Sequence, residues 1–361
     1  MGYNNYMEQN YQQQIETLLD IVYQNGASDL HVSVGRHPHI RVNGQLNPVT
    51  QYPVLTEDDM IGIVTALAGE EKAQRLVHLE EIDFAYDYGD KLRLRGNAYI
   101  QSNKIAMALR TIQKIKTLAE LRLPESLLQF VRAKQGFFLV VGPVGVGKST
   151  TLAALIDVIN TERREHIVTI EHPIEYIHPE KQSIIDQREV GIDTKSFHSA
   201  LESAFREDVN VILVGEMQTP ETIATAVTAA ETGHLVLSTL HTNSAAQTVD
   251  RIIDTFPPEQ ESQVRVQLAA SLLGIFSQRL VPSLKGGLVP AYELLINTPA
   301  VANLIREKRT HEIDTLIETG TDHGMISMNR SLIELVRAGE ISIDSAKTYS
   351  TNPNSLESMI Q

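Results

Sequence analysis

The 361-residue sequence contains no cysteine. This absence excludes disulfide bonds, thiolate zinc sites and a cysteine nucleophile. No apolar run approaches the roughly 18 residues that would span a bilayer. Residues 1–14 are rich in Asn, Gln and Tyr, and they lack the basic segment and apolar core of a signal peptide. We therefore expect a cytoplasmic protein that meets a membrane only through a partner.

The sequence also lacks a surplus of basic residues. It has 31 Lys and Arg against 45 Asp and Glu, which gives a formal net charge of -14. Proteins that coat nucleic acid need a basic surface to neutralise phosphates. We therefore expect no nucleic-acid partner. The length is enough for two domains of the usual size, about 100 to 200 residues each.

Residues 1–112 have the patterns of a small α+β domain. Thr56 followed by Asp59 is typical of a capping box at the start of a helix. The lysine-rich segment 113–118 is expected to be a linker. The elements predicted before it are a helix over 15–22 that ends at Asn25-Gly26, strands over 30–34 and 39–42, a hairpin turn at Asn43-Gly44, a helix over 57–67, and strands over 82–88 and 91–100 joined at Gly89-Asp90.

From residue 119 onward, apolar strands alternate with amphipathic helices. This alternation predicts an α/β domain whose parallel sheet is covered on both faces. Beyond Pro257 we expect mostly helix, because Val264, Leu268, Leu272, Leu273 and Phe276 follow a helical stripe. The earlier predictions are a helix from Pro124 to Gly136, strands over 137–141, 167–170, 209–214 and 235–240, and helices over 149–160, 196–207, 220–232 and 244–255.

The segment Gly142–Thr150 matches the phosphate-binding pattern G-x-x-x-x-G-K-[ST]. Its glycines let backbone N–H groups turn toward phosphate oxygens, Lys148 reaches the β- and γ-phosphates, and the Ser149 hydroxyl binds Mg²⁺. The helix that follows adds a favourable dipole end. Its apolar face is Leu152, Leu155, Ile156 and Ile159. The residues expected to contact a nucleoside triphosphate are Gly142, Pro143, Gly145, Val146, Gly147, Lys148, Ser149 and Thr150.

Polar residues follow the other predicted strands of this sheet, where ligands of parallel sheets bind. The strand over 167–170 leads into Glu171 and Glu175, and the strand that ends at Val214 leads into Glu216. A carboxylate there can bind Mg²⁺ or orient the attacking water, and Glu216 is the strongest candidate. His234 and His241 have two open interpretations: either senses the γ-phosphate or forms a hydrogen bond in a half-buried strand.

Phosphoryl transfer usually also needs a cation against the γ-phosphate, often an arginine from a neighbouring subunit. Arg93, Arg95 and Arg110 lie on strands predicted in the first domain. Their charge pattern alone favours ordinary surface arginines.

Taken together, four stretches resemble the secretion-type ATPases of type IV pilus machines, and most of all the PilT-type pilus retraction (twitching motility) ATPases. Ala27–His31 also resembles a signature of their PAS-like N-terminal domain. The four stretches are Gly142–Thr151, similar to the Walker A motif, Thr169–Glu175, similar to the aspartate box, Ile212–Met217, similar to the atypical Walker B motif, and Ala230–His234 through Thr239–Thr242, similar to the histidine box.

The resemblance implies a RecA-like ATPase domain over 119–361 and a PAS-like domain over 1–112. It implies a homohexamer that hydrolyses ATP with Mg²⁺ between its domains, located at the inner face of the cytoplasmic membrane. The implied partners are the inner-membrane pilus platform protein and a paralogous pilus ATPase. The implied site residues are Glu175 and Glu216 as the acidic pair, with Glu216 and Ser149 toward Mg²⁺, His234 and His241 of the histidine box, and Arg95 and Arg110 from a ring neighbour.

Two positions depart from the family pattern. His172 stands where the aspartate box usually has Asp, and Ala302 stands where the C-terminal retraction motif has its first arginine. The missing cysteines favour retraction, because extension and type II secretion relatives generally carry a four-cysteine zinc element. Two alternatives stay open: a motor or accessory ATPase of a related pilus, DNA-uptake or secretion assembly, and a nucleotide-binding switch with weak hydrolysis.

Overall fold

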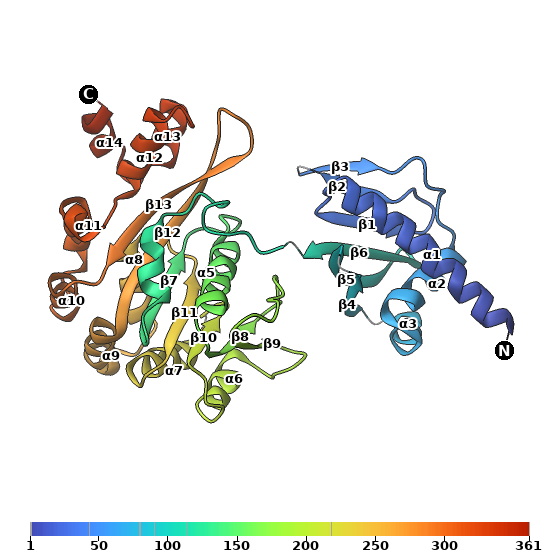
Figure 1. Ribbon diagram of the computed structural model, residues 1–361, viewed down its shortest axis with the longest axis horizontal. Coiled ribbons are helices and arrows are strands. Elements are labelled where there is room, and N and C mark those ends of the chain that lie inside the picture. The colour runs from blue at the N-terminus through green and yellow to red at the C-terminus, as the bar shows by residue number, and fades with distance from the viewer. Residues whose placement is uncertain are drawn as a thin grey trace. The chain divides into compact units, whose positions relative to one another are not determined.

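The computed structural model describes residues 2–42, 44–78, 81–89, 91–112, 114–217 and 219–360 (Figure 1). Asn43 and Asp90, in the two predicted turns, and Gln113, the first residue of the predicted linker, lie outside the described residues. The chain divides into two compact units, Met1–Lys114 and Ile115–Gln361.

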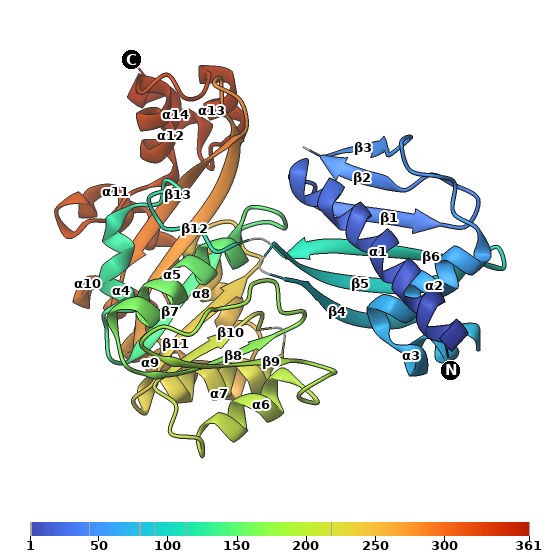
Figure 2. The same cartoon turned by 45° about the vertical axis from the view of Figure 1, so that its right-hand side comes forward.

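The first unit is an antiparallel sheet with helices packed on one face (Figure 2). The capping box predicted at Thr56 is present and begins α2. The sheet order is β3-β2-β1-β6-β5-β4. The elements are α1 (Gly2–Gln24), β1 (Asp29–Ser33), β2 (His39–Val42), β3 (Gln45–Pro48), α2 (Glu57–Ala68), α3 (Glu70–Val77), β4 (Ile82–Tyr88), β5 (Leu92–Gln101) and β6 (Lys104–Ile112).

The second unit is built on a seven-stranded sheet, in the order β13-β12-β7-β11-β10-β8-β9. Its neighbouring strands are parallel except for the pair β12 and β13. The predicted α/β class is therefore confirmed. The strands are β7 (Gly136–Val141), β8 (His166–Glu171), β9 (Ile184–Glu189), β10 (Val211–Val214), β11 (Leu235–Leu240), β12 (Leu272–Pro282) and β13 (Leu288–Ile296).

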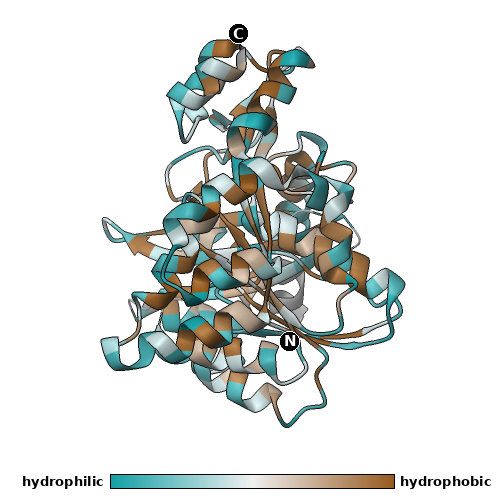
Figure 3. Ribbon diagram, turned by 90° about the vertical axis from the view of Figure 1, so that its left-hand side faces the viewer, coloured by the Kyte–Doolittle hydropathy of each residue, from teal (hydrophilic) through white to brown (hydrophobic). Residues whose placement is uncertain are grey.

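Helices cover both faces of this sheet, as continuous apolar strands require. Alternate residues of β7 enter two different cores: Phe138 and Val140 pack with α5, and Phe137 and Leu139 pack on the opposite face. Figure 3 shows brown, hydrophobic strands at the centre. The helices are α4 (Leu128–Val131), α5 (Lys148–Glu162), α6 (Phe197–Ala204), α7 (Pro220–Glu231), α8 (Ala245–Ile253) and α9 (Pro258–Ser271).

The helical prediction beyond Pro257 is wrong for residues 272–296. The stripe that includes Val264 and Leu268 ends with α9, and Leu272 begins β12 instead. A continuous apolar run fits a buried strand as well as a helix, and here β12 pairs with both β7 and β13. The helix predicted from Pro124 to Gly136 is also shorter, because α4 covers only Leu128–Val131.

The last part of the chain is helical and has a small core of its own. This core joins the strand residues Val281 and Val289 to Met328, Leu332 and Ile341. Among the described residues, no helix is both long and apolar enough to cross a membrane. The helices are α10 (Pro299–Arg306), α11 (Ile313–Thr319), α12 (Met328–Arg337), α13 (Ile343–Tyr349) and α14 (Pro353–Ile360).

Candidate functional site

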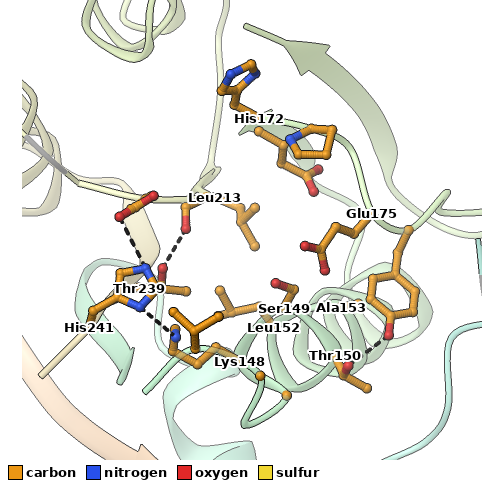
Figure 4. A pocket seen from close by; sticks show the side chains of 18 of the residues that line it. Lys148, Ser149, Thr150, Leu152, Ala153, His172, Glu175, Leu213, Thr239 and His241 are labelled. Atoms are coloured by element: carbon orange, nitrogen blue, oxygen red, sulfur yellow. Dashed lines mark hydrogen bonds and ion pairs between the residues drawn. The ribbon is translucent and has the colours of Figure 1, made fainter. Parts of the chain in front are cut away.

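A cavity of about 380 Å³ lies at the carboxyl ends of the parallel strands (Figure 4). The phosphate-binding loop follows β7, and β11 lies between β7 and β10 in the sheet. This order brings together side chains that are far apart in the sequence. The residues predicted for the site that line the cavity are Gly145, Gly147, Lys148, Ser149, Thr150, Glu175, Glu216 and His241.

The loop has the geometry of an anion cradle. Gly145 and Gly147 adopt φ values of +81° and +86°, which side chains disfavour. In the part of the chain that the structure describes, no protein oxygen accepts a hydrogen bond from the N–H groups of Gly145, Val146 and Gly147. These donors and the start of α5 fit a phosphate group.

Lys148 is the first residue of α5 and is only 8% exposed. Its Nζ donates to the carbonyl oxygens of Gly142 at 2.9 Å and Pro143 at 3.0 Å, so the ammonium is held against the loop. Burial lowers the pKa of Lys148, while Glu216 and Glu175 partly oppose that shift. Two carboxylates therefore face one buried cation.

Gln278 of β12 braces the loop, and sequence reasoning missed it because β12 was predicted as helix. Its side chain is 4% exposed and makes two hydrogen bonds. Nε2 donates to the carbonyl oxygen of Val146 at 2.8 Å, and Oε1 accepts from the Thr151 hydroxyl at 2.7 Å. A neighbouring strand thus fixes both the loop and the first turn of α5.

Replacing Gly142 by alanine should lower the free energy of unfolding by about 2 to 5 kcal/mol, from backbone strain and overpacking together. Gly142 has φ +144°, and an added Cβ would lie 2.4 Å from the carbonyl oxygen of Gln278. Urea unfolding measures the change. Gly145→Ala is the control: nothing lies within 4 Å of its Cβ, so it should cost only about 1 to 2 kcal/mol. An equal loss of stability in the two variants would contradict the close contact between a Cβ at position 142 and the Gln278 carbonyl oxygen.

Glu216, His241 and Lys148 form a chain of contacts across the cavity (Figure 4). Glu216 Oε1 lies 3.2 Å from His241 Nε2, and His241 Nδ1 lies 3.2 Å from Lys148 Nζ. Thr239 of β11 donates its hydroxyl proton to the carbonyl oxygen of Gly215 at 2.6 Å. This bond ties β11 to the turn that carries Glu216.

Glu175 reaches the cavity on a segment that β9 holds in place. Gln187 accepts a hydrogen bond from the His178 N–H at 3.0 Å and donates to the Tyr176 carbonyl oxygen at 2.8 Å. Glu189 accepts from the Ile174 N–H at 3.1 Å. Polar side chains of an edge strand that the sequence did not predict therefore position a predicted carboxylate.

Two more side chains of this segment line the cavity. The Tyr176 hydroxyl bonds the Thr150 hydroxyl at 2.8 Å, which attaches the segment to α5. His172 is exposed, and Figure 4 shows its imidazole pointing away from Ser149, whereas the carboxylate of Glu175 points toward Ser149.

Two titratable groups of the cavity wall are perturbed by burial. Burial raises the pKa of Glu171, against the hydrogen bonds that its carboxylate accepts from Thr169 and Gln187. Burial also lowers the pKa of His178 to about 4, so its imidazole is neutral at physiological pH. Sequence reasoning named Glu171 only as one of the polar residues that follow the strand over 167–170, and it gave His178 no role.

The structure does not bring His234 into the cavity. It precedes β11, at the opposite end of the strand from His241. Its Nδ1 lies 3.1 Å from the Ala229 carbonyl oxygen, and its ring packs edge-on against Phe205. Three residues of the phosphate-binding loop, Gly142, Pro143 and Val146, also lie outside the cavity lining. Their carbonyl oxygens accept hydrogen bonds from Lys148 and Gln278.

Arg95 and Arg110 belong to the first unit and are directly opposite each other on β5 and β6. Paired residues of neighbouring strands lie on the same sheet face, and like charges in this position are unfavourable. Arg110 Nε donates to Asp29 Oδ1 at 3.0 Å, and its side chain is 77% exposed. The sheet therefore carries two arginine side chains on one face.

A glycine loop that opens a helix behind a central parallel strand, with a buried lysine and two facing carboxylates, defines a P-loop nucleotide-binding protein. The chain belongs to the type II/IV secretion system protein family, whose model matches residues 7–288.

The similar proteins include two curated relatives and a solved structure. The chain is 42% identical to the type IV pilus retraction ATPase PilT of Pseudomonas aeruginosa, over 94% of this chain and 98% of the relative. It is 43% identical to a twitching motility protein of Neisseria gonorrhoeae, over 88% and 86% of the two chains. The crystal structure of the pilus retraction motor PilT with bound ADP matches with a TM-score of 0.89 and 43% identity, over 96% and 99%.

Proposed function

We propose that this protein is a homohexameric ATPase motor that hydrolyses ATP to power type IV pilus retraction. The observation that carries the proposal is the cavity in which Lys148, Glu175, Glu216 and His241 meet. Support comes from the nearly full-length similarity to a retraction ATPase and to a motor crystallised with ADP. Neither alternative role has a specific observation in its favour.

We assign the site residues by their geometry. The N–H groups of the loop bind the phosphates, and Lys148 neutralises the β- and γ-phosphates. The Ser149 hydroxyl and the Glu216 carboxylate would hold Mg²⁺, which would offset the charge that develops on the phosphates. Glu175 and Glu216 orient the attacking water, and His241 links Glu216 to Lys148.

The ring assembly completes the site. Arg95 and Arg110 of a neighbouring subunit supply the cations that stabilise the transition state. The exposure of Arg110 and the pairing of the two arginines on one sheet face support this role. We assign residues 1–112 to a PAS-like domain, 113–118 to a linker and 119–361 to the ATPase domain. The motor acts on the inner-membrane pilus platform protein from the cytoplasmic side, alongside a paralogous pilus ATPase.

Deleting the gene should leave cells with persistent fibres that do not retract, because assembly would continue without the retraction motor. Time-lapse imaging of fluorescently labelled pili measures this result. Restoring the wild-type gene should restore retraction, whereas a gene encoding Glu216→Gln should not. Loss of the fibres on deletion would contradict retraction and indicate an assembly motor.

A further inference from the structure

The hairpin of β12 and β13 holds residues 241–244, which connect β11 to α8, and Ala245, the first residue of α8. Ser277 of β12 and Glu293 of β13 are directly opposite each other in this hairpin. Ser277 Oγ donates to the carbonyl oxygen of Asn243 at 3.0 Å, and the Ala245 N–H donates to Glu293 Oε1 at 2.8 Å. One cross-strand pair thus fixes the backbone on both sides of Ser244.

Glu293 is an unusual residue for this position, because its side chain is an acid that is only 5% exposed. Burial raises its pKa to about 7, and the carboxylate of Asp314 on α11 acts in the same direction. The Ala245 N–H and the Arg279 guanidinium oppose the shift. Arg279 lies two residues after Ser277 on the same strand, and within the described residues its buried Nε has no hydrogen-bond partner.

The segment that Glu293 holds begins with His241. The His241 imidazole lies 3.2 Å from both Lys148 Nζ and Glu216 Oε1. Only Thr242, Asn243 and Ser244 separate it from Ala245, the first residue of α8. A shift of this short backbone would therefore move the imidazole relative to the two charged groups that we assign to ATP hydrolysis.

We propose that Glu293 is a positioning residue, whose charge state sets how firmly the C-terminal hairpin holds the segment that carries His241. The inference rests on the proposed ATPase function. An ionised carboxylate makes a stronger hydrogen bond to the Ala245 N–H than a protonated one, and its charge complements the helix dipole. The ionised form holds the segment in place, and the protonated form loosens it.

The rate of ATP hydrolysis at saturating Mg-ATP, measured from pH 5.5 to 9, tests the proposal. The wild-type rate should rise about 3- to 10-fold as Glu293 ionises near neutral pH. Glu293→Gln keeps the shape without the charge, so it should lose this rise and stay low at pH 8. Asp314→Asn removes a carboxylate that repels the ionised Glu293, so the midpoint of the rate increase with pH should move to lower pH. Ser277→Ala, the matched control in the same pair, should lower the rate without moving the midpoint.

Hydrogen exchange of peptides covering residues 241–248, corrected for intrinsic rates, gives a readout that does not require hydrolysis. Wild-type protection should be greater at pH 8 than at pH 6, and Glu293→Gln should show no difference. The two proposals can fail separately. If the wild-type protein binds ATP without hydrolysing it, the ATPase function is overturned. If the same protein still shows the pH-dependent exchange that Glu293→Gln lacks, the positioning role remains intact. An unchanged pH profile and unchanged exchange in Glu293→Gln would overturn the positioning role.

The melting temperature checks both folding and ionisation. Burial raises the pKa of Glu293 in the folded chain above its ordinary value of 4.5. Ionisation therefore opposes folding, and the cost grows as pH rises from about 4.5 to about 7. The melting temperature of Glu293→Gln relative to wild type should rise between pH 5 and pH 8. If that variant does not fold, the midpoint shift in Asp314→Asn decides the question, and no shift would overturn the proposal.

Discussion

Replacing Glu216 by glutamine should slow ATP hydrolysis by about 10²- to 10⁴-fold, which is the usual contribution of a general base. Glutamine keeps the size and one acceptor oxygen but can neither take a proton nor carry charge toward Mg²⁺. It would also weaken the contact of this side chain with His241 Nε2, which lies 3.2 Å from Glu216 Oε1, because a neutral amide would replace the carboxylate. Phosphate release measured at saturating Mg-ATP gives the rate.

ATP binding should survive this change, because the loop N–H groups and Lys148, which we propose as the phosphate ligands, all remain in the variant. Binding of a fluorescent ATP analogue should stay within about 10-fold of wild type. Glu202→Gln is the matched control, since Glu202 is an exposed glutamate on α6. Turnover by Glu216→Gln at the rate of the Glu202 control would exclude the assigned role of Glu216.

Replacing Lys148 by alanine should abolish productive ATP binding and lower turnover on the order of 100-fold or more, the cost of removing a preorganised transition-state donor. Lys148 is the buried cation of the loop, at 8% exposure. The change also removes its hydrogen bonds to Gly142 and Pro143. Calorimetric titration with Mg-ATP measures binding, and Lys134→Ala, at an exposed lysine outside the cavity, is the control.

Mixing this variant with Arg110→Ala tests whether the arginines act between subunits. Each variant alone should be nearly inactive. In mixed rings, an Arg110→Ala subunit keeps a complete loop, and a Lys148→Ala neighbour supplies an intact Arg110. Turnover should therefore recover in part on mixing. A mixture with no more activity than its components, or a protein that stays monomeric with nucleotide by native mass spectrometry, would contradict the shared site.

Local chemistry explains why several elements could be predicted. The capping box at Thr56 depends on residues three positions apart, and it is present. The apolar face of α5 also follows from spacing alone: Leu152, Leu155, Ile156 and Ile159 are all buried in one core. The loop pattern similarly predicted a strand, a glycine turn and a helix, and the structure contains β7, the loop and α5 in that order.

The largest error falls where burial removes the periodic signal. Residues of β12 are buried on both faces, so no alternation of polar and apolar residues distinguished a strand from a helix. Missing this strand also meant missing Gln278, which bonds the phosphate-binding loop, and Ser277, which bonds the segment that begins with His241. The strand β9 was missed for a different reason, since it lies at the sheet edge with a mostly polar sequence.

The sequence by itself determined that the protein holds a phosphate-bearing ligand, because Gly142–Thr150 carries its chemistry in consecutive residues. Only the tertiary structure decided which strand ends meet that loop. The insertion of β11 between β7 and β10 places His241 between Lys148 and Glu216 and leaves His234 at the far end of the same strand. Strand order depends on contacts between distant segments, which local sequence patterns do not encode.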